Sequence, residues 1–174
     1  MNARLASVHA SAVNVGNRAV LIRGPSGSGK SRLAFDLIMA GRAGQIPHAV
    51  LVGDDRVHLD TADEKIVVRP VRELAGLMEI RGLGIRRCDF IEEAIVGLVV
   101  DLSAADAERL PPPEALLTHI DGVIIPRIPV GAGFSAFPLV VAALTMTANS
   151  SSAQPSGDCS KGIGNHISPT IATE

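Results

Sequence analysis

Aromatic side chains are almost absent from this sequence, which has four Phe, no Trp and no Tyr among 174 residues. The core must therefore be aliphatic, and the aromatic platforms on which single-stranded nucleic acids stack are missing. The 16 basic and 18 acidic residues give a formal net charge of −2, so nothing attracts a polyanion in general. We expect no nucleic-acid partner.

Cysteine is equally scarce. Cys88 and Cys159 lie far apart in unlike surroundings and predict neither a disulfide framework nor a metal site. The N-terminus has no signal-peptide core, and the apolar run at 134–146 is shorter than the ~20 residues that span a bilayer and contains Pro138. We expect a cytoplasmic protein without membrane contact.

The length and a hydrophobic content of 47% fit one globular domain with a substantial core. Beyond Asn149 the composition changes to Ser, Gly, Pro, Thr and Asn. We expect one α/β domain over residues 1–148 and a disordered tail without chemistry over 149–174.

One stretch fits the phosphate-binding pattern G-x-x-x-x-G-K-[ST]: Gly24-Pro25-Ser26-Gly27-Ser28-Gly29-Lys30-Ser31. An apolar strand at 18–23 precedes it, and apolar residues at helical spacing follow it as far as Gly41, which we expect as the C′ residue. Glycines let backbone N–H groups surround phosphate oxygens, Lys30 would approach the β- and γ-phosphates, and Ser31 would ligate Mg²⁺. The alternative is a glycine-rich turn that matches by chance.

Two adjacent carboxylates, Asp54 and Asp55, follow the short apolar strand 49–52. Downstream of a phosphate loop, one such carboxylate can hold Mg²⁺ or its water while the other accepts a proton from a hydroxyl nucleophile. The alternative is an ordinary acidic turn that leads into a hairpin of strands 57–59 and 65–69.

Further along, Glu79 and Arg81 alternate with apolar residues and would share one face of an extended segment, before Gly82 and Gly84. This favours a second metal or phosphate contact, with a surface ion pair as the alternative. Strands are expected at 4–15, where a turn leads back into 18–23, and at 95–102 and 122–128. A last helix is expected at 136–147.

These three segments, in this order, resemble the HPr kinase/phosphorylase family. The matching residues are the loop in the form Gly24-x-Ser26-Gly27-x-Gly29-Lys30-Ser31, the strand end Asp54-Asp55-Arg56-Val57 and the segment Glu79-Ile80-Arg81-Gly82-Leu83-Gly84-Ile85. The resemblance covers roughly 9–128. It implies a P-loop domain of the phosphoenolpyruvate-carboxykinase-like type, with a mixed sheet and flanking helices, that assembles as hexamers. It also implies an ATP- and Mg²⁺-dependent protein-serine kinase of the phosphotransferase system, acting on the phosphocarrier protein HPr or a nitrogen-branch homologue.

The resemblance also assigns roles. The catalytic set would be His9, Lys30, Asp54, Asp55 and Arg109, with Asp55 preferred as the base. The nucleotide would meet the 24–31 loop with Arg81 and Gly82, and Mg²⁺ would be held by Ser31, Asp54 and Glu79. From the residues alone, His9 would more often be a structural histidine.

Two features depart from the family. Ala10 follows His9 where glycine is expected, and the stretch 129–133 lacks the arginine of the loop linked to dephosphorylation, which leaves the phosphorylase reaction open. The chain also looks like the short forms that lack the N-terminal domain of longer members. Two other functions fit the loop: a kinase for a small metabolite, and a regulatory nucleotide-binding module without catalysis.

Overall fold

The computed structural model describes residues 6–147, which form a mixed α/β fold. In chain order the elements are β1 (Ser7–Val8), β2 (Ala10–Val15), β3 (Arg18–Arg23), α1 (Lys30–Arg42), β4 (Ala49–Gly53), β5 (Val57–Ala62), β6 (Lys65–Pro70), η1 (Arg72–Leu74), β7 (Leu77–Ile80), β8 (Gly84–Arg87), β9 (Ala94–Leu102), η2 (Pro113–Leu116), β10 (Leu117–Ile120), β11 (Val123–Val130) and α2 (Phe137–Thr145). The two η elements are short 3-10 helices. The tail expected at 149–174 lies outside the described residues.

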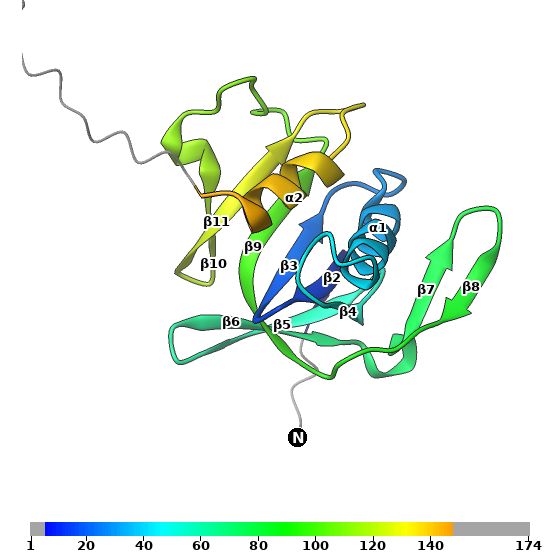
Figure 1. Ribbon diagram of the computed structural model, residues 1–174. Helices are drawn as coiled ribbons and strands as arrows, with labels where there is room; N and C mark the ends of the chain where they lie inside the picture. Colours follow the sequence, from blue (N-terminus) through cyan, green and yellow to red (C-terminus); the bar gives the residue numbers. More distant parts are fainter. Residues whose placement is uncertain (1–5, 148–174) are drawn as a thin grey trace, which may run out of the picture.

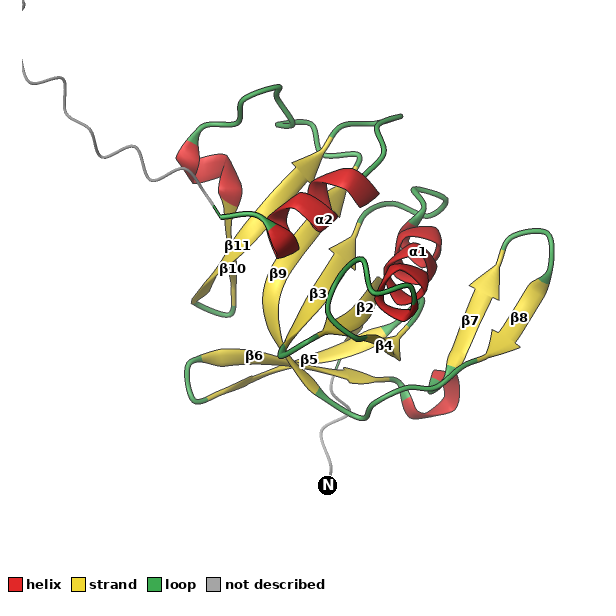
Figure 2. Cartoon of the chain, in the orientation of Figure 1, coloured by secondary structure: helices red, strands yellow, loops and turns green. Residues whose placement is uncertain are grey.

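A curled sheet of nine strands organises the fold, and both α-helices lie in front of it in Figure 2. Its central order is β4-β2-β3-β9-β11-β10. Strands β3, β9 and β11 are parallel, whereas β2 is inserted antiparallel between β3 and β4. The first residues of β9 pair with β6, so that the β5–β6 hairpin continues the curled sheet below the central strands (Figure 1).

Alternation along the central strands feeds two apolar cores, because successive side chains of a strand point to opposite faces. On the helical face, Val20 and Ile22 of β3 pack with Leu37 of α1. On the other face, Leu21 packs with Ile66 of the β5–β6 hairpin. The sheet is therefore covered on both sides, which fixes the positions of its strand ends.

The strand expected at 4–15 is divided at His9 into β1 and β2, and its first two residues lie outside the described part. The other expected strands, the helix that follows the glycine loop and the last helix are confirmed with small changes of boundary. The prediction for Gly41 is wrong, because this residue lies inside α1. A Cβ atom there would come within 2.7 Å of both Cβ and N of Ala49. Glycine is thus needed for close packing of α1 on β4, and it does not end the helix.

The segment after Met78 also differs from the expectation. Glu79 lies in β7, but Arg81 lies in the turn of the β7–β8 hairpin, so the two do not share a strand face. A Cβ atom on Gly82 would meet nothing within 4 Å, and its φ is +84°. The positive φ of this glycine suits the turn, and the space beside it is open.

Candidate active site

The carboxyl ends of β3, β4, β9 and β11 meet at one edge of the sheet, because these strands run in the same direction. The 24–31 loop leaves β3 there, and Asp54 and Asp55 leave β4 there. The amino end of β2, with His9 before it, lies between them. In open α/β sheets this edge is where ligands bind.

Residues 24–31 (called the glycine loop from here) join β3 to α1. Gly24, Gly27 and Gly29 have φ values of +149°, +78° and +98°, a region that other residues rarely adopt. A Cβ on Gly24 would lie 2.7 Å from Oγ of Ser28 and 2.9 Å from Cβ of Leu102. Oγ of Ser28 is buried and has no hydrogen-bond partner within residues 6–147. The loop is tightly folded, and α1 begins directly after it.

Lys30 is the first residue of α1 and is only 6% exposed. Its Nζ donates hydrogen bonds of 3.0 Å to the carbonyl oxygens of Gly24 and Pro25. Burial lowers the pKa of its ammonium group, and the negative charges of Asp55 and Asp54 act in the opposite direction. The two carboxylates thus favour the charged form of the lysine, although they follow a different strand.

Asp54 is an almost fully buried carboxylate, 3% exposed. Its Oδ1 accepts a hydrogen bond of 2.5 Å from Oγ of Ser11, which is itself fully buried. Its Oδ2 accepts a bond of 3.3 Å from the backbone N–H of Glu79. Asp54 thus joins β4 to β2 and to the β7–β8 hairpin, and Ser11 is a member of the site that the sequence analysis missed.

Asp55 has a different environment. Its side chain is 65% exposed, and its Oδ1 lies 3.3 Å from Nε2 of His9, whose side chain is 40% exposed. Its φ of +65° places it in the left-handed region, where few residues other than glycine are found. The Asp55 carboxylate is thus exposed and lies next to the imidazole.

The other predicted residues are placed as follows. Ser31 is partly buried in the first turn of α1, and Ser26, Glu79, Arg81 and Gly82 are exposed. Arg109 is exposed on the segment between β9 and η2. Within residues 6–147, no hydrogen bond or ion pair joins Arg109 to the other predicted residues.

No three His, Cys, Asp or Glu side chains of the described part converge as a preformed metal cage would require. A hydroxyl such as Ser31 with one or two carboxylates nevertheless fits Mg²⁺, which usually takes few protein ligands and completes its shell with water and phosphate oxygens. The residues that could hold it are Ser31, Asp54 and Glu79.

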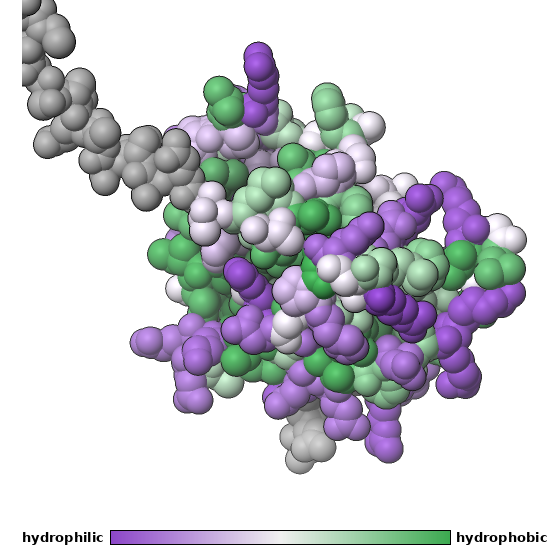
Figure 3. Space-filling view, in the orientation of Figure 1, coloured by the Kyte–Doolittle hydropathy of each residue, from purple (hydrophilic) through white to green (hydrophobic). Residues whose placement is uncertain are grey.

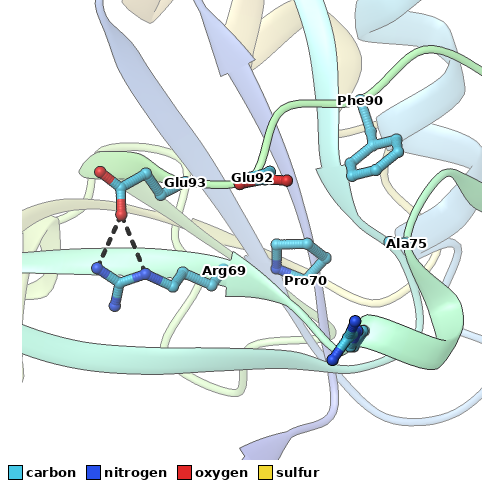
Figure 4. A pocket seen from close by; sticks show the side chains of 7 residues that line it. Arg69, Pro70, Ala75, Phe90, Glu92 and Glu93 are labelled. Carbon is cyan, nitrogen blue, oxygen red and sulfur yellow. Dashed lines mark hydrogen bonds and ion pairs between the residues drawn. The ribbon is translucent and has the colours of Figure 1, made fainter.

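A separate hollow, with a cavity volume of about 830 Å³, lies between the end of β6 and the segment before β9. Figure 4 shows Phe90 and Pro70 beside it and Arg69 bonded to Glu93. None of the predicted site residues lines it. We therefore assign the chemistry to the sheet edge and not to this hollow.

Two surface findings complete the description. In Figure 3, hydrophilic side chains gather over the β7–β8 hairpin, where Arg81, Arg86 and Arg87 are exposed. Within residues 6–147, no helix is both long enough and apolar enough to cross a bilayer.

Several known proteins are similar to this chain. The model of the HPr Serine kinase C-terminal domain family matches residues 2–155. A protein of Enterococcus faecalis named HPr kinase/phosphorylase is 45% identical over 80 residues, which are 45% of this chain and 24% of that protein. One of the same name from Mycoplasma mycoides is 41% identical over 80 residues, 46% of this chain and 23% of that one. The matched part thus spans about a quarter of the length of these relatives.

A solved structure is also similar. The HPr(Ser) kinase/phosphatase from Coxiella burnetii superposes with a TM-score of 0.63, covering 80% of this chain and 93% of the other, at 24% identity. At this identity the likeness concerns the fold alone.

Proposed function

This chain belongs to the family of HPr serine kinase C-terminal domains, and we propose that it is an ATP- and Mg²⁺-dependent kinase for a seryl hydroxyl of HPr or a nitrogen-branch homologue. In this proposal the domain is of the P-loop, phosphoenolpyruvate-carboxykinase-like type. It acts in the cytoplasm as a homo-oligomer, a hexamer by resemblance, and regulates the phosphotransferase system.

One observation carries the proposal. The glycine loop, with the buried ammonium group of Lys30 held inside it, leaves β3 at the same sheet edge where Asp54 and Asp55 leave β4. A cation that neutralises phosphate charge and an acid that can accept a proton are both required for transfer from ATP to a hydroxyl. Their meeting at one sheet edge favours a kinase over a module that only binds nucleotide.

Asp55 is the better candidate for the base. Its carboxylate is exposed and faces His9, whereas both oxygens of Asp54 already accept hydrogen bonds. In the proposed step the seryl oxygen forms a bond to the γ-phosphorus, the bond from the γ-phosphorus to the β–γ bridging oxygen breaks, and ADP leaves. The seryl proton passes to Asp55, and the neighbouring imidazole of His9 orients that carboxylate.

The remaining residues would bind and orient the nucleotide. Backbone N–H groups of the glycine loop, with Arg81 and Gly82, would hold phosphate oxygens, and Arg109 would neutralise charge on the transferred group. Ser31, Glu79 and the outer lone pairs of the Asp54 carboxylate would hold Mg²⁺, which supplies charge neutralisation at the phosphates when bound.

The test is a transfer assay with ATP labelled in the γ-phosphate, Mg²⁺ and purified HPr. We expect label on a serine of HPr, and loss of both nucleotide affinity and transfer in Lys30→Met, which keeps the apolar stem and removes the charge. Label found only on a small molecule from a metabolite pool would favour a metabolite kinase. Saturable ATP binding without transfer to any acceptor would favour the regulatory module.

A further inference from the structure

Two arginines and two aspartates form an ion-pair network along the sheet edge, on the face opposite the α-helices. The members are Arg23 at the end of β3, Asp101 near the end of β9, Arg127 in β11, and Asp106 in the segment 103–112 between β9 and η2. Arg23 and Asp101 are direct partners in the parallel register of β3 and β9. The sequence analysis did not identify this ion-pair network.

The arginines bind the carboxylates through bidentate hydrogen bonds. Nε and Nη2 of Arg23 donate to the two oxygens of Asp101 at 2.6 and 2.8 Å. Nε of Arg127 donates to the same carboxylate at 2.5 Å, and its Nη1 and Nη2 donate to Asp106 at 2.6 and 2.9 Å. Nη1 of Arg127 also donates to the carbonyl of Ala115 at 3.0 Å. Bidentate pairs of this kind fix direction as well as distance.

Burial distinguishes the centre of this ion-pair network from ordinary surface ion pairs, whereas Asp106 at its end is 53% exposed. The side chains of Arg127 and Asp101 are 13% and 17% exposed, whereas Arg32 in the pair on α1 is 79% exposed. Burial alone would raise the pKa of Asp101, but hydrogen bonds from Arg23 and Arg127 hold it below its ordinary value. The carboxylate thus stays charged in a place where an unpaired charge would be costly.

The ion-pair network links the strand that leads into the glycine loop to the segment that carries Arg109. Arg23 directly precedes Gly24 of the glycine loop, and Asp106 lies three residues before Arg109. The segment 103–112 is attached at its start by the N–H of Ala104, which donates to the carbonyl of Val130 at 2.9 Å. The bidentate hydrogen bonds from Arg127 to Asp106 attach the segment a second time, close in sequence to Arg109.

We propose that Asp106 and Arg127 are positioning residues, which hold the segment carrying Arg109 in register with the strand that ends in the glycine loop. The inference rests on the proposed function in one respect only, the catalytic role of Arg109. A merely structural pairing would stabilise the fold without affecting transfer through Arg109 in particular.

The experiment uses Asp106→Asn, with Glu93→Gln as the matched control. Glu93 also accepts two bonds from one arginine, Arg69, and is 62% exposed where Asp106 is 53% exposed. We expect Asp106→Asn to lower kcat about 10- to 100-fold, the usual effect of a small misplacement, with KM for ATP unchanged. In an Arg109→Ala background, Asp106→Asn should cause no further fall in kcat.

A second measurement does not depend on activity. Limited trypsin digestion followed by mass spectrometry should show faster cleavage after Arg109 in Asp106→Asn, and unchanged cleavage after Arg86 and Arg87 in the distant hairpin. Arg127→Lys, which keeps the charge and loses the bidentate hydrogen bonds, should give the same result. Glu93→Gln should resemble the wild type in both measurements.

The outcomes are separable. Equal losses of kcat with and without Arg109, or unchanged cleavage after Arg109, would overturn the inference. If the wild-type protein transfers no phosphate, the proposed function fails, and the cleavage rates still decide whether Asp106 holds the segment. Faster cleavage restricted to Arg109 supports the inference in either case.

Discussion

Substitution of the adjacent residues Asp54 and Asp55 should affect different properties, namely stability at Asp54 and phosphate transfer at Asp55. Asp54→Ala removes the acceptor for the buried hydroxyl of Ser11 and for the N–H of Glu79. Hydrogen bonds to a charged group contribute about 1.5–3 kcal/mol each, and the bond of 3.3 Å should count for less. Alanine avoids the cost of burying a carboxylate, which offsets part of this loss. We therefore expect a net loss of roughly 2–4 kcal/mol in the free energy of unfolding.

Asp55→Asn should leave stability almost unchanged. The side chain is 65% exposed, and asparagine tolerates the left-handed backbone at φ +65° better than most residues. We expect a change of about 0.5 kcal/mol or less. If Asp55 is the base, however, transfer to HPr should fall about 10²- to 10⁴-fold, with nucleotide affinity retained.

Thermal unfolding followed by circular dichroism, beside the γ-phosphate transfer assay, separates the two roles. A loss of 2–4 kcal/mol lowers Tm by roughly 4–16 °C in a domain of this size. Because Ser11→Ala acts on the same hydrogen bond, it should add little to Asp54→Ala in a double-mutant cycle. Equal falls in Tm for the two aspartate variants, or full transfer activity in Asp55→Asn, would refute the division of roles.

Two further predictions concern stability alone. Gly41→Ala should lower Tm although alanine favours helices by about 1 kcal/mol, because the added Cβ would lie 2.7 Å from Ala49 and overpacking costs about 1–3 kcal/mol; a rise in Tm on thermal unfolding would contradict this. Asp101 has a lowered pKa in the folded state, so its stabilisation is full above the unfolded value near ~4 and is lost as pH falls through the folded value. At pH 7, Asp101→Asn should lower the free energy of unfolding by about 1–3 kcal/mol, because the arginine donors lose their charged acceptor. In urea titrations this difference from the wild type should shrink below pH ~4, and a constant difference would count against the pairing.

The parts of the fold that the sequence could predict are those with local signals. The strand, glycine loop and helix around Lys30 follow from one short pattern and from helical spacing, and the structure has them at the expected places. The hairpin after Asp55 follows from two strand-like runs around a polar turn, in which Asp63 and Glu64 both have positive φ. In each case the interactions that decide the structure lie within a few residues.

What could not be predicted depends on which strands become neighbours. Arg23 and Asp101 each close an apolar strand, but their pairing exists only because β3 and β9 lie side by side in register. The prediction for Gly41 fails for the same reason. Its small size is needed because it packs against Ala49 of β4, and the sequence does not show that contact. Charged residues that end apolar strands were the available signal, and alone they do not show which strands are adjacent.

Strand order also bears on the proposal that the glycine loop and Asp55 act on one bond. Strand β2 lies between β3, which leads into the glycine loop, and β4, which leads into Asp55. Neighbouring strands are about 4.8 Å apart, so the ends of β3 and β4 are separated by roughly 10 Å and not by one spacing. A separation of this size has room for a phosphoryl group and an acceptor oxygen in line with it, as the proposed transfer requires. We infer that the inserted strand sets this separation, and the same insertion brings His9 beside Asp55, because the amino end of β2 lies at the edge where β4 ends.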